Sequence, residues 1–168
     1  MTKTSDSVMS SYERLSVWLL VPACILYSLA LVSHAWFELP GVFYGLWWAE
    51  FCDYLSCQII PAFFTEEPVW YHILQLVSLF GMVAMSVCLA LLVTKRCDFF
   101  IPEKMRRQQT ASAIGLASVF AISLALMMFY GKLDESSPRA SPQIRWSAVI
   151  AGTACLLEFG AALLLLQT

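Results

Sequence analysis

The chain has 168 residues, of which 60% are hydrophobic and only 13% carry a charged side chain, and its formal net charge is −2. A water-soluble domain of this size would not tolerate so much apolar surface, so lipid is expected to be its main solvent. The nearly balanced charge excludes the basic surface that nucleic-acid binding requires.

Apolar segments long enough to cross a bilayer recur along the chain, and its length has room for about four of roughly 20 residues each. The polar residues before the first segment include Ser10 and Glu13, which have the spacing of a capping box at a helix start. A cleaved signal peptide ending near Ala35 is the alternative for that segment, although its apolar stretch exceeds the usual core of about 7 to 15 residues. The predicted spans are 15–36, 69–93, 111–130 and 146–167.

Lys and Arg are distributed unevenly between these spans. The residues before the first span and the loop 94–110 hold seven of the ten basic residues, whereas the loops 37–68 and 131–145 hold three. Positive side chains accumulate on the cytoplasmic side of membrane proteins. Both termini are therefore predicted to be cytoplasmic, with the loops 37–68 and 131–145 outside the cell and the protein in the plasma membrane.

Of the six cysteines, only Cys52 and Cys57 lie in a loop predicted to be external, where oxidation is permitted. They are predicted to form a disulfide that closes a small hairpin. Two free thiols are the alternative. A zinc site is less favoured, because His34 and His72 lie apart from any further cluster of ligands.

The first external loop also carries a recognisable motif. Trp36 at the end of the first span is followed by Gly45, Leu46 and Trp47, and then by the two cysteines. This W, GLW, C, C pattern resembles the signature of the peripheral myelin protein and claudin superfamily, which also includes epithelial membrane proteins, lens fibre membrane protein and calcium-channel gamma subunits. The resemblance implies internal termini and a first external loop larger than the second.

This loop is shorter than that of a claudin, with about 32 residues. At about 5 residues per strand plus turns, a sheet of four or five strands is hard to accommodate, which argues against a paracellular pore. The β-prone segment 42–48 follows a Pro40-Gly41 turn and predicts a short strand pair. Gly45 is expected to let Trp47 fold back over the helix ends as a structural anchor.

Aromatic side chains are dense in the same loop, which contains no basic residue. Some rings are expected at the headgroups, but their number exceeds what a thin cap can bury, and exposed aromatic surface often marks a partner site. The acidic side chains of the loop could favour cations or form a solvated face. The residues predicted for a partner surface are Phe43, Tyr44, Trp48, Phe51 and Tyr54.

Glu158 is the only charged residue inside a predicted span, where an ionised carboxylate costs roughly 2.5 to 3.5 kcal/mol. It is predicted to face other helices and to be protonated or hydrogen-bonded. Its role is either structural, a proton or cation relay, or a contact with another protein's helix. The candidate partners are Tyr27, Ser28, Gln75, Ser78, Ser118 and Ser123.

Small residues recur at helical spacing in the third and fourth spans, which permits close approach of helices. Packing within the bundle and self-association are both compatible with this pattern. The residues concerned are Ala113, Ala117, Ala121, Ala125, Ala148 and Gly152. Cys97, just beyond the second span and beside two basic residues, is placed for S-palmitoylation.

The sequence contains no motif for catalysis, so the chain is predicted to be non-enzymatic and without a cofactor or metal. The predicted fold is an all-α membrane protein, a single four-helix transmembrane bundle with a small extracellular β-structured cap. The predicted partners are membrane lipid and another membrane protein or a second copy, for an auxiliary subunit, trafficking factor or membrane organiser. The alternatives are a claudin-like cell-junction barrier or paracellular cation pore, and a small transporter that uses Glu158.

Overall fold

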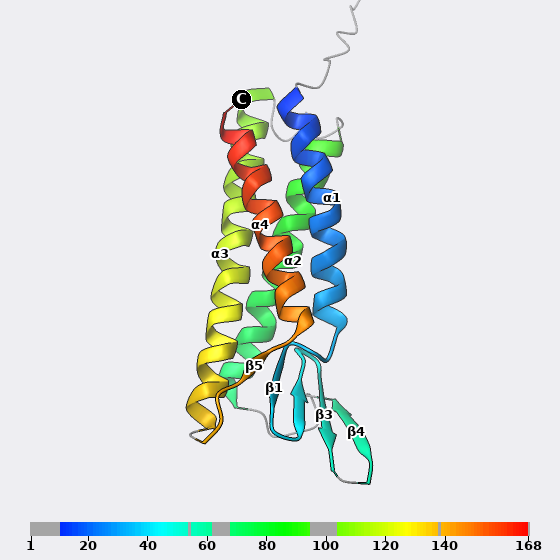
Figure 1. Ribbon diagram of the computed structural model, residues 1–168. Helices are drawn as coiled ribbons and strands as arrows, with labels where there is room; N and C mark the ends of the chain where they lie inside the picture. Colours follow the sequence, from blue (N-terminus) through cyan, green and yellow to red (C-terminus); the bar gives the residue numbers. More distant parts are fainter. Residues whose placement is uncertain (1–10, 54, 62–67, 95–103, 138, 168) are drawn as a thin grey trace, which may run out of the picture.

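The computed structural model describes residues 11–53, 55–61, 68–94, 104–137 and 139–167. Within these ranges the chain forms four helices and five strands (Figure 1). Each helix is long and apolar enough to cross a membrane. The predicted fold class, a helical membrane bundle with a small β-structured cap, is therefore confirmed. The helices are α1 (Ser11–Val32), α2 (Val69–Val93), α3 (Lys104–Ser136) and α4 (Trp146–Leu166).

The helices pack side by side, with α1 against α4 and α2, and α3 against α2 and α4. Figure 1 shows the sheet at one end of this bundle, the cap end, and the start of α1 and the end of α4 at the other, the distal end. Small side chains let α1 and α4 approach closely, because Ala23 and Ala30 of α1 and Ala154 of α4 are completely buried. Ser16 also donates a hydrogen bond across this contact, to the Ala161 carbonyl oxygen at 3.2 Å.

The third helix is longer than predicted at both ends. Residues 104–110 and 131–136, assigned to loops from their polarity, continue the helix on either side of the predicted span 111–130. Hydropathy locates only the part of a helix that lies in hydrocarbon, whereas good helix formers extend it into the polar region. At the cap end, Lys132 Nζ and Glu135 Oε2 form an i,i+3 ion pair at 2.5 Å that supports the last turn.

The first helix ends earlier than predicted, at Val32 rather than at residue 36. Trp36 lies beyond the helix, where the chain turns back under the bundle, and its side chain is completely buried. Its indole nitrogen donates to the Ala30 carbonyl oxygen at 2.6 Å. The apolar pattern continued past the end of the helix because the following residues enter the same core.

The cap is an antiparallel sheet of five strands in the order β4-β3-β2-β1-β5, within the part of the chain placed by the structure. The predicted strand pair is present in this sheet, because β2 and β3 pair antiparallel with Tyr44 opposite Ala49. The expectation that a sheet of four or five strands would not fit was wrong for two reasons. The first two strands have only three residues each, and β5 comes from the connection between α3 and α4 rather than from the first loop. The strands are β1 (Phe37–Leu39), β2 (Val42–Tyr44), β3 (Trp48–Cys52), β4 (Cys57–Pro61) and β5 (Gln143–Ile144).

Candidate functional site at the cap end

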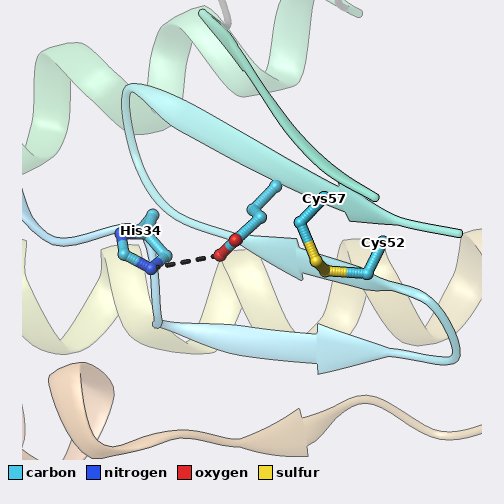
Figure 2. The surroundings of a disulfide bond; sticks show 4 residues. His34, Cys52 and Cys57 are labelled. Atoms are coloured by element: carbon cyan, nitrogen blue, oxygen red, sulfur yellow. Dashed lines mark ion pairs between the residues drawn. A yellow bond between two sulfur atoms is a disulfide. The ribbon is translucent and has the colours of Figure 1, made fainter. Parts of the chain in front are cut away.

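The disulfide between Cys52 and Cys57 is present, as predicted, and joins the ends of β3 and β4 (Figure 2). The two residues face each other in the strand register, with their Cα atoms 4.0 Å apart. The Asp53 amide donates to the Ser56 carbonyl oxygen at 2.9 Å, which closes the turn between the strands. The covalent bond therefore fixes the free end of the β3–β4 hairpin, farthest along the sheet from β5.

Gly45 lies where the sheet meets the bundle, and its lack of a side chain is required there. An added Cβ would stand 2.5 Å from the Cα of His34, 2.7 Å from the Ser33 carbonyl oxygen and 2.9 Å from that of Trp48. All three are backbone atoms, which cannot move aside independently of the chain. The glycine of the GLW motif is thus explained by the close approach of two backbone segments.

The next two residues of the motif, Leu46 and Trp47, are buried to different depths. Leu46 is completely buried in the core, whereas Trp47 is half-buried and packs against the core from outside. The prediction that Trp47 covers the helix ends agrees with this contact, but the most deeply inserted residue is Leu46. Sequence reasoning missed it because a single leucine between a glycine and a tryptophan carries no signal of depth.

Two side chains of α2 hold this segment in place by hydrogen bonds to its backbone. The Tyr71 hydroxyl donates to the Gly45 carbonyl oxygen at 2.5 Å, and Gln75 Nε2 donates to the Leu46 carbonyl oxygen at 2.9 Å. Gln75 was considered as a partner for Glu158, but it binds the cap instead. The role of Tyr71 was not predicted, because tyrosine at the start of a span is also typical of residues at the headgroups.

The register of the strands separates the predicted partner residues onto two faces of the sheet. Directly paired residues share a face, so the pairs Phe43–Glu50 and Glu50–Ile59 place these side chains together, with Trp48 two residues before Glu50 on the same side. We call Phe43, Trp48 and Ile59 the outer aromatic face. Trp48 is 38% exposed and Ile59 is 58% exposed.

The opposite face of the sheet points toward the bundle. Phe37, Tyr44 and Ala49 are linked by the register, and of these Phe37 and Ala49 are buried while Tyr44 packs against the core. Phe51 is two residues after Ala49 and so lies on the same face, but it is at the free end of the hairpin and is 38% exposed. The five predicted partner residues thus do not form one surface, and Tyr54 lies outside the described residues.

Two carboxylates on the side of the outer aromatic face have basic side chains beside them. Arg145, just before α4, forms an ion pair with Glu38 of β1, and its guanidinium lies over the Phe43 ring, 5.3 Å from the ring centre. His34 Nε2 lies 3.3 Å from Glu50 Oε2 (Figure 2). The ion pair of Arg145 with Glu38 reduces the free negative charge on this side of the sheet.

Three possible metal ligands, Glu50, Cys52 and Cys57, have ligand atoms within 4.8 Å of one another. A cysteine binds a metal through its thiolate, but here the two sulfurs are bonded to each other and offer none. His72 lies on α2 with its Nδ1 3.3 Å from Gln75 Oε1, on a different element from His34. The arrangement is therefore a covalently closed hairpin rather than a metal centre.

Glu158 is completely buried in the bundle and is bound by Ser118 of α3. The serine hydroxyl lies 2.8 Å from the Gly81 carbonyl oxygen and 2.9 Å from Glu158 Oε2. A hydroxyl has one hydrogen and the Gly81 carbonyl can only accept, so both contacts are satisfied when Glu158 is a neutral acid that donates to Ser118. Glu158 Oε1 has no hydrogen-bond partner among the described residues.

A second buried polar cluster, at the distal end, was not predicted. Gln108 Nε2 of α3 donates to Glu13 Oε1 of α1 at 2.8 Å, and Arg107 Nη2 lies 3.6 Å from the same oxygen. The exposed fractions of the three residues are 2% for Glu13, 8% for Arg107 and 5% for Gln108. The cluster was missed because Arg107 and Gln108 were assigned to a loop rather than to the first turns of α3.

The small residues of the third and fourth spans have different environments. Ala121, Ala125 and Ala148 are buried in the bundle, whereas Ala113 and Ala117 are exposed. Gly152 is half-buried, and a Cβ added to it would meet no atom within 4 Å. Cys97, predicted for palmitoylation, lies outside the described residues.

A scan of the sequence against protein-family models found no match, and a search of curated proteins likewise found none.

Proposed function

We propose that this chain is a non-enzymatic four-span membrane protein that acts by binding another membrane protein, or a second copy of itself, through the outer aromatic face. The observation that supports this most is the grouping of Phe43, Trp48 and Ile59 on the side of the sheet that faces away from the bundle. Aromatic side chains bury a large apolar area on binding and are frequent at the centres of protein interfaces.

The sheet presents this face in a fixed conformation. The disulfide joins β3 to β4, and the hydrogen bonds from Tyr71 and Gln75 hold the adjoining segment on α2. A partner would meet a surface that is already ordered, so association would cost little conformational entropy. The pairing of Glu38 with Arg145 also lowers the electrostatic cost of covering the surface.

We further propose kinship with the peripheral myelin protein and claudin superfamily, with both termini cytoplasmic and the cap outside the plasma membrane. The W, GLW, C, C pattern supports this, because its residues have structural roles where the sheet joins the bundle. Trp36 and Leu46 are buried there, Gly45 permits the close backbone approach, and the cysteines close the hairpin. An auxiliary subunit, a trafficking factor and a membrane organiser all fit this proposal.

A second candidate function is a claudin-like junction barrier or paracellular cation pore. It is favoured by one observation, the five-stranded sheet, since the first loop had been judged too short for one. A cation pore, however, needs free negative charge along its path, and Glu38 of the sheet is already paired with Arg145. Binding to a membrane protein is therefore the better supported function.

Crosslinking in native membranes tests the proposal. The double variant Phe43→Ala, Trp48→Ala should lose the membrane protein that crosslinks to the unaltered chain, as identified by mass spectrometry. The matched control is Trp18→Ala, because Trp18 is 77% exposed but lies on α1. Equal crosslinking by all three proteins would contradict the proposal. Strands and altered ion permeability in cells that lack junctions would favour the second candidate.

A further inference from the structure

An apolar hollow of about 340 Å³ lies at the cap end of the bundle, where α3, α4 and the β1–β5 edge of the sheet meet. Its volume is within the range of roughly 300 to 1,000 Å³ that is typical of small-molecule sites. Among the lining side chains of the described residues, only Tyr130 carries a polar group. The hollow is lined by Phe37, Leu126, Met127, Tyr130, Ile144 and Ala148.

A small residue of α4 forms part of the wall of the hollow. Ala148 forms part of the lining, and Gly152, one turn further along α4, borders open space in which an added Cβ would meet no atom within 4 Å. Both residues were predicted to permit close helix packing. Ala148 is buried in the bundle, in agreement with that prediction, whereas Gly152 has open space beside it.

The position of the hollow along the helices indicates what fills it. Met127 is 75% exposed on a helix that is apolar enough to cross a membrane, so it faces hydrocarbon. Tyr130, which is 38% exposed, lies in the last two turns of α3, and Trp146, which is 54% exposed, begins α4 at the same end of the bundle. Such rings prefer the headgroup level. The hollow therefore opens toward the hydrocarbon just below the headgroups on the cap side.

We propose that this hollow binds an acyl chain of a phospholipid from the membrane leaflet on the cap side. The lining is almost entirely hydrocarbon, which matches a lipid tail, and Tyr130 contributes the one hydroxyl group among the described lining residues. This lipid site is independent of the outer aromatic face, which lies on other residues of the sheet.

The shape of the rim favours an acyl chain over a helix of a second copy. Met127 and Ile144, which line the hollow, are large and are 75% and 62% exposed, so they stand out from the surface beside the buried Ala148. A helix with its side chains is about 10 Å wide and would rest on these projecting side chains. A single extended acyl chain is narrow enough to pass between them.

Photolabelling in reconstituted bilayers tests this assignment, with phosphatidylcholine that carries a diazirine in its acyl chain as the probe. The expected result is a lipid adduct concentrated on Met127 and Ile144, mapped by mass spectrometry. Ala148→Leu fills the hollow and should lose this adduct, whereas Ala117→Leu, at an exposed position on α3, should retain it. Met127→Trp covers the hollow from an exposed position and should also reduce the adduct on Ile144. This second test does not depend on core packing.

Three outcomes would overturn the proposal. The first is an adduct spread evenly over the lipid-facing surfaces of all the helices and unchanged by Ala148→Leu and Met127→Trp. The second is preferential labelling of the hollow by a photoreactive cholesterol. The third is efficient crosslinking of two chains through Met127→Cys with loss of the lipid adduct, which would show a second copy in the hollow.

Discussion

The hydroxyl of Tyr71 and the carbonyl oxygen of Gly45 are joined by a hydrogen bond of 2.5 Å that connects the second helix to the sheet. One turn further along α2, Gln75 makes the equivalent bond to Leu46 at 2.9 Å. Gly45 and Leu46 are both buried. Removal of either donor would leave a buried carbonyl without this partner, which costs about 1 to 3 kcal/mol.

Tyr71→Phe and Gln75→Leu are therefore each expected to lower the free energy of unfolding by about 1 to 3 kcal/mol. Thermal unfolding in detergent micelles measures the effect. Tyr12→Phe provides the control, because Tyr12 is 47% exposed at the distal end and its change should leave the unfolding temperature unaltered. Equal unfolding temperatures for Tyr71→Phe and Tyr12→Phe would show that the hydroxyl contributes nothing to cap attachment.

Gly45→Ala should disrupt the junction between sheet and bundle, because its Cβ would stand within 3.0 Å of three backbone atoms. The expected result is a lower unfolding temperature and faster proteolysis of the cap. Gly131→Ala is the matched control, since nothing lies within 4 Å of its added Cβ, and alanine in a helix is favoured over glycine by roughly 0.5 to 1 kcal/mol. If both variants behaved alike, the close approach at Gly45 would not be required.

The spans and the disulfide could be predicted from the sequence because each follows from a local property. The apolar stretch of α2 was predicted at 69–93 and begins and ends there, and the two cysteines of the first loop are bonded as expected. Apolar length reports the thickness of hydrocarbon, and cysteine placement reports access to oxidation. Neither property depends on which helices are neighbours.

The attachment of the cap could not be predicted, because it depends on contacts between segments distant in sequence. The β5 strand has two residues and forms only by pairing with β1, more than one hundred positions earlier in the chain. The burial of Leu46 depends in the same way on α2, which supplies Gln75. The outer aromatic face also required the strand register, since a shift of one residue exchanges the two faces.

Glu158→Gln is expected to fold with nearly unchanged stability. The amide of glutamine can donate to Ser118, which still donates to the Gly81 carbonyl, so the contacts made by a neutral acid are kept. Ser118→Ala removes the partner of a completely buried acid and should lower the free energy of unfolding by about 1 to 3 kcal/mol. Chemical or thermal unfolding compares the two variants. A larger loss for Glu158→Gln than for Ser118→Ala would indicate that Glu158 is ionised.

The distal cluster should stabilise the bundle through coupling of Glu13 to Arg107. Glu13→Ala removes the carboxylate that lies 3.6 Å from the buried guanidinium of Arg107. This change should lower the free energy of unfolding by about 1 to 3 kcal/mol or more. Arg107→Met should also lower the free energy of unfolding. The double variant should lose less stability than the sum of the losses in the two single variants. Arg14→Met, at the neighbouring exposed position, is the control. Additive losses in the double-mutant cycle would exclude the coupling.

The side of the membrane on which the cap lies can be tested by cysteine labelling in intact cells. The proposed orientation predicts that Arg139→Cys, exposed in the connection between α3 and β5, reacts with a membrane-impermeant maleimide. Gln109→Cys, exposed near the distal end, should react only after permeabilisation. Both changes are made in a Cys97→Ser background, so that the natural thiol next to α2 does not contribute. Labelling of Gln109→Cys but not Arg139→Cys in intact cells would place the cap in the cytoplasm, where the disulfide would be exposed to reduction and the outer aromatic face could not meet an extracellular domain.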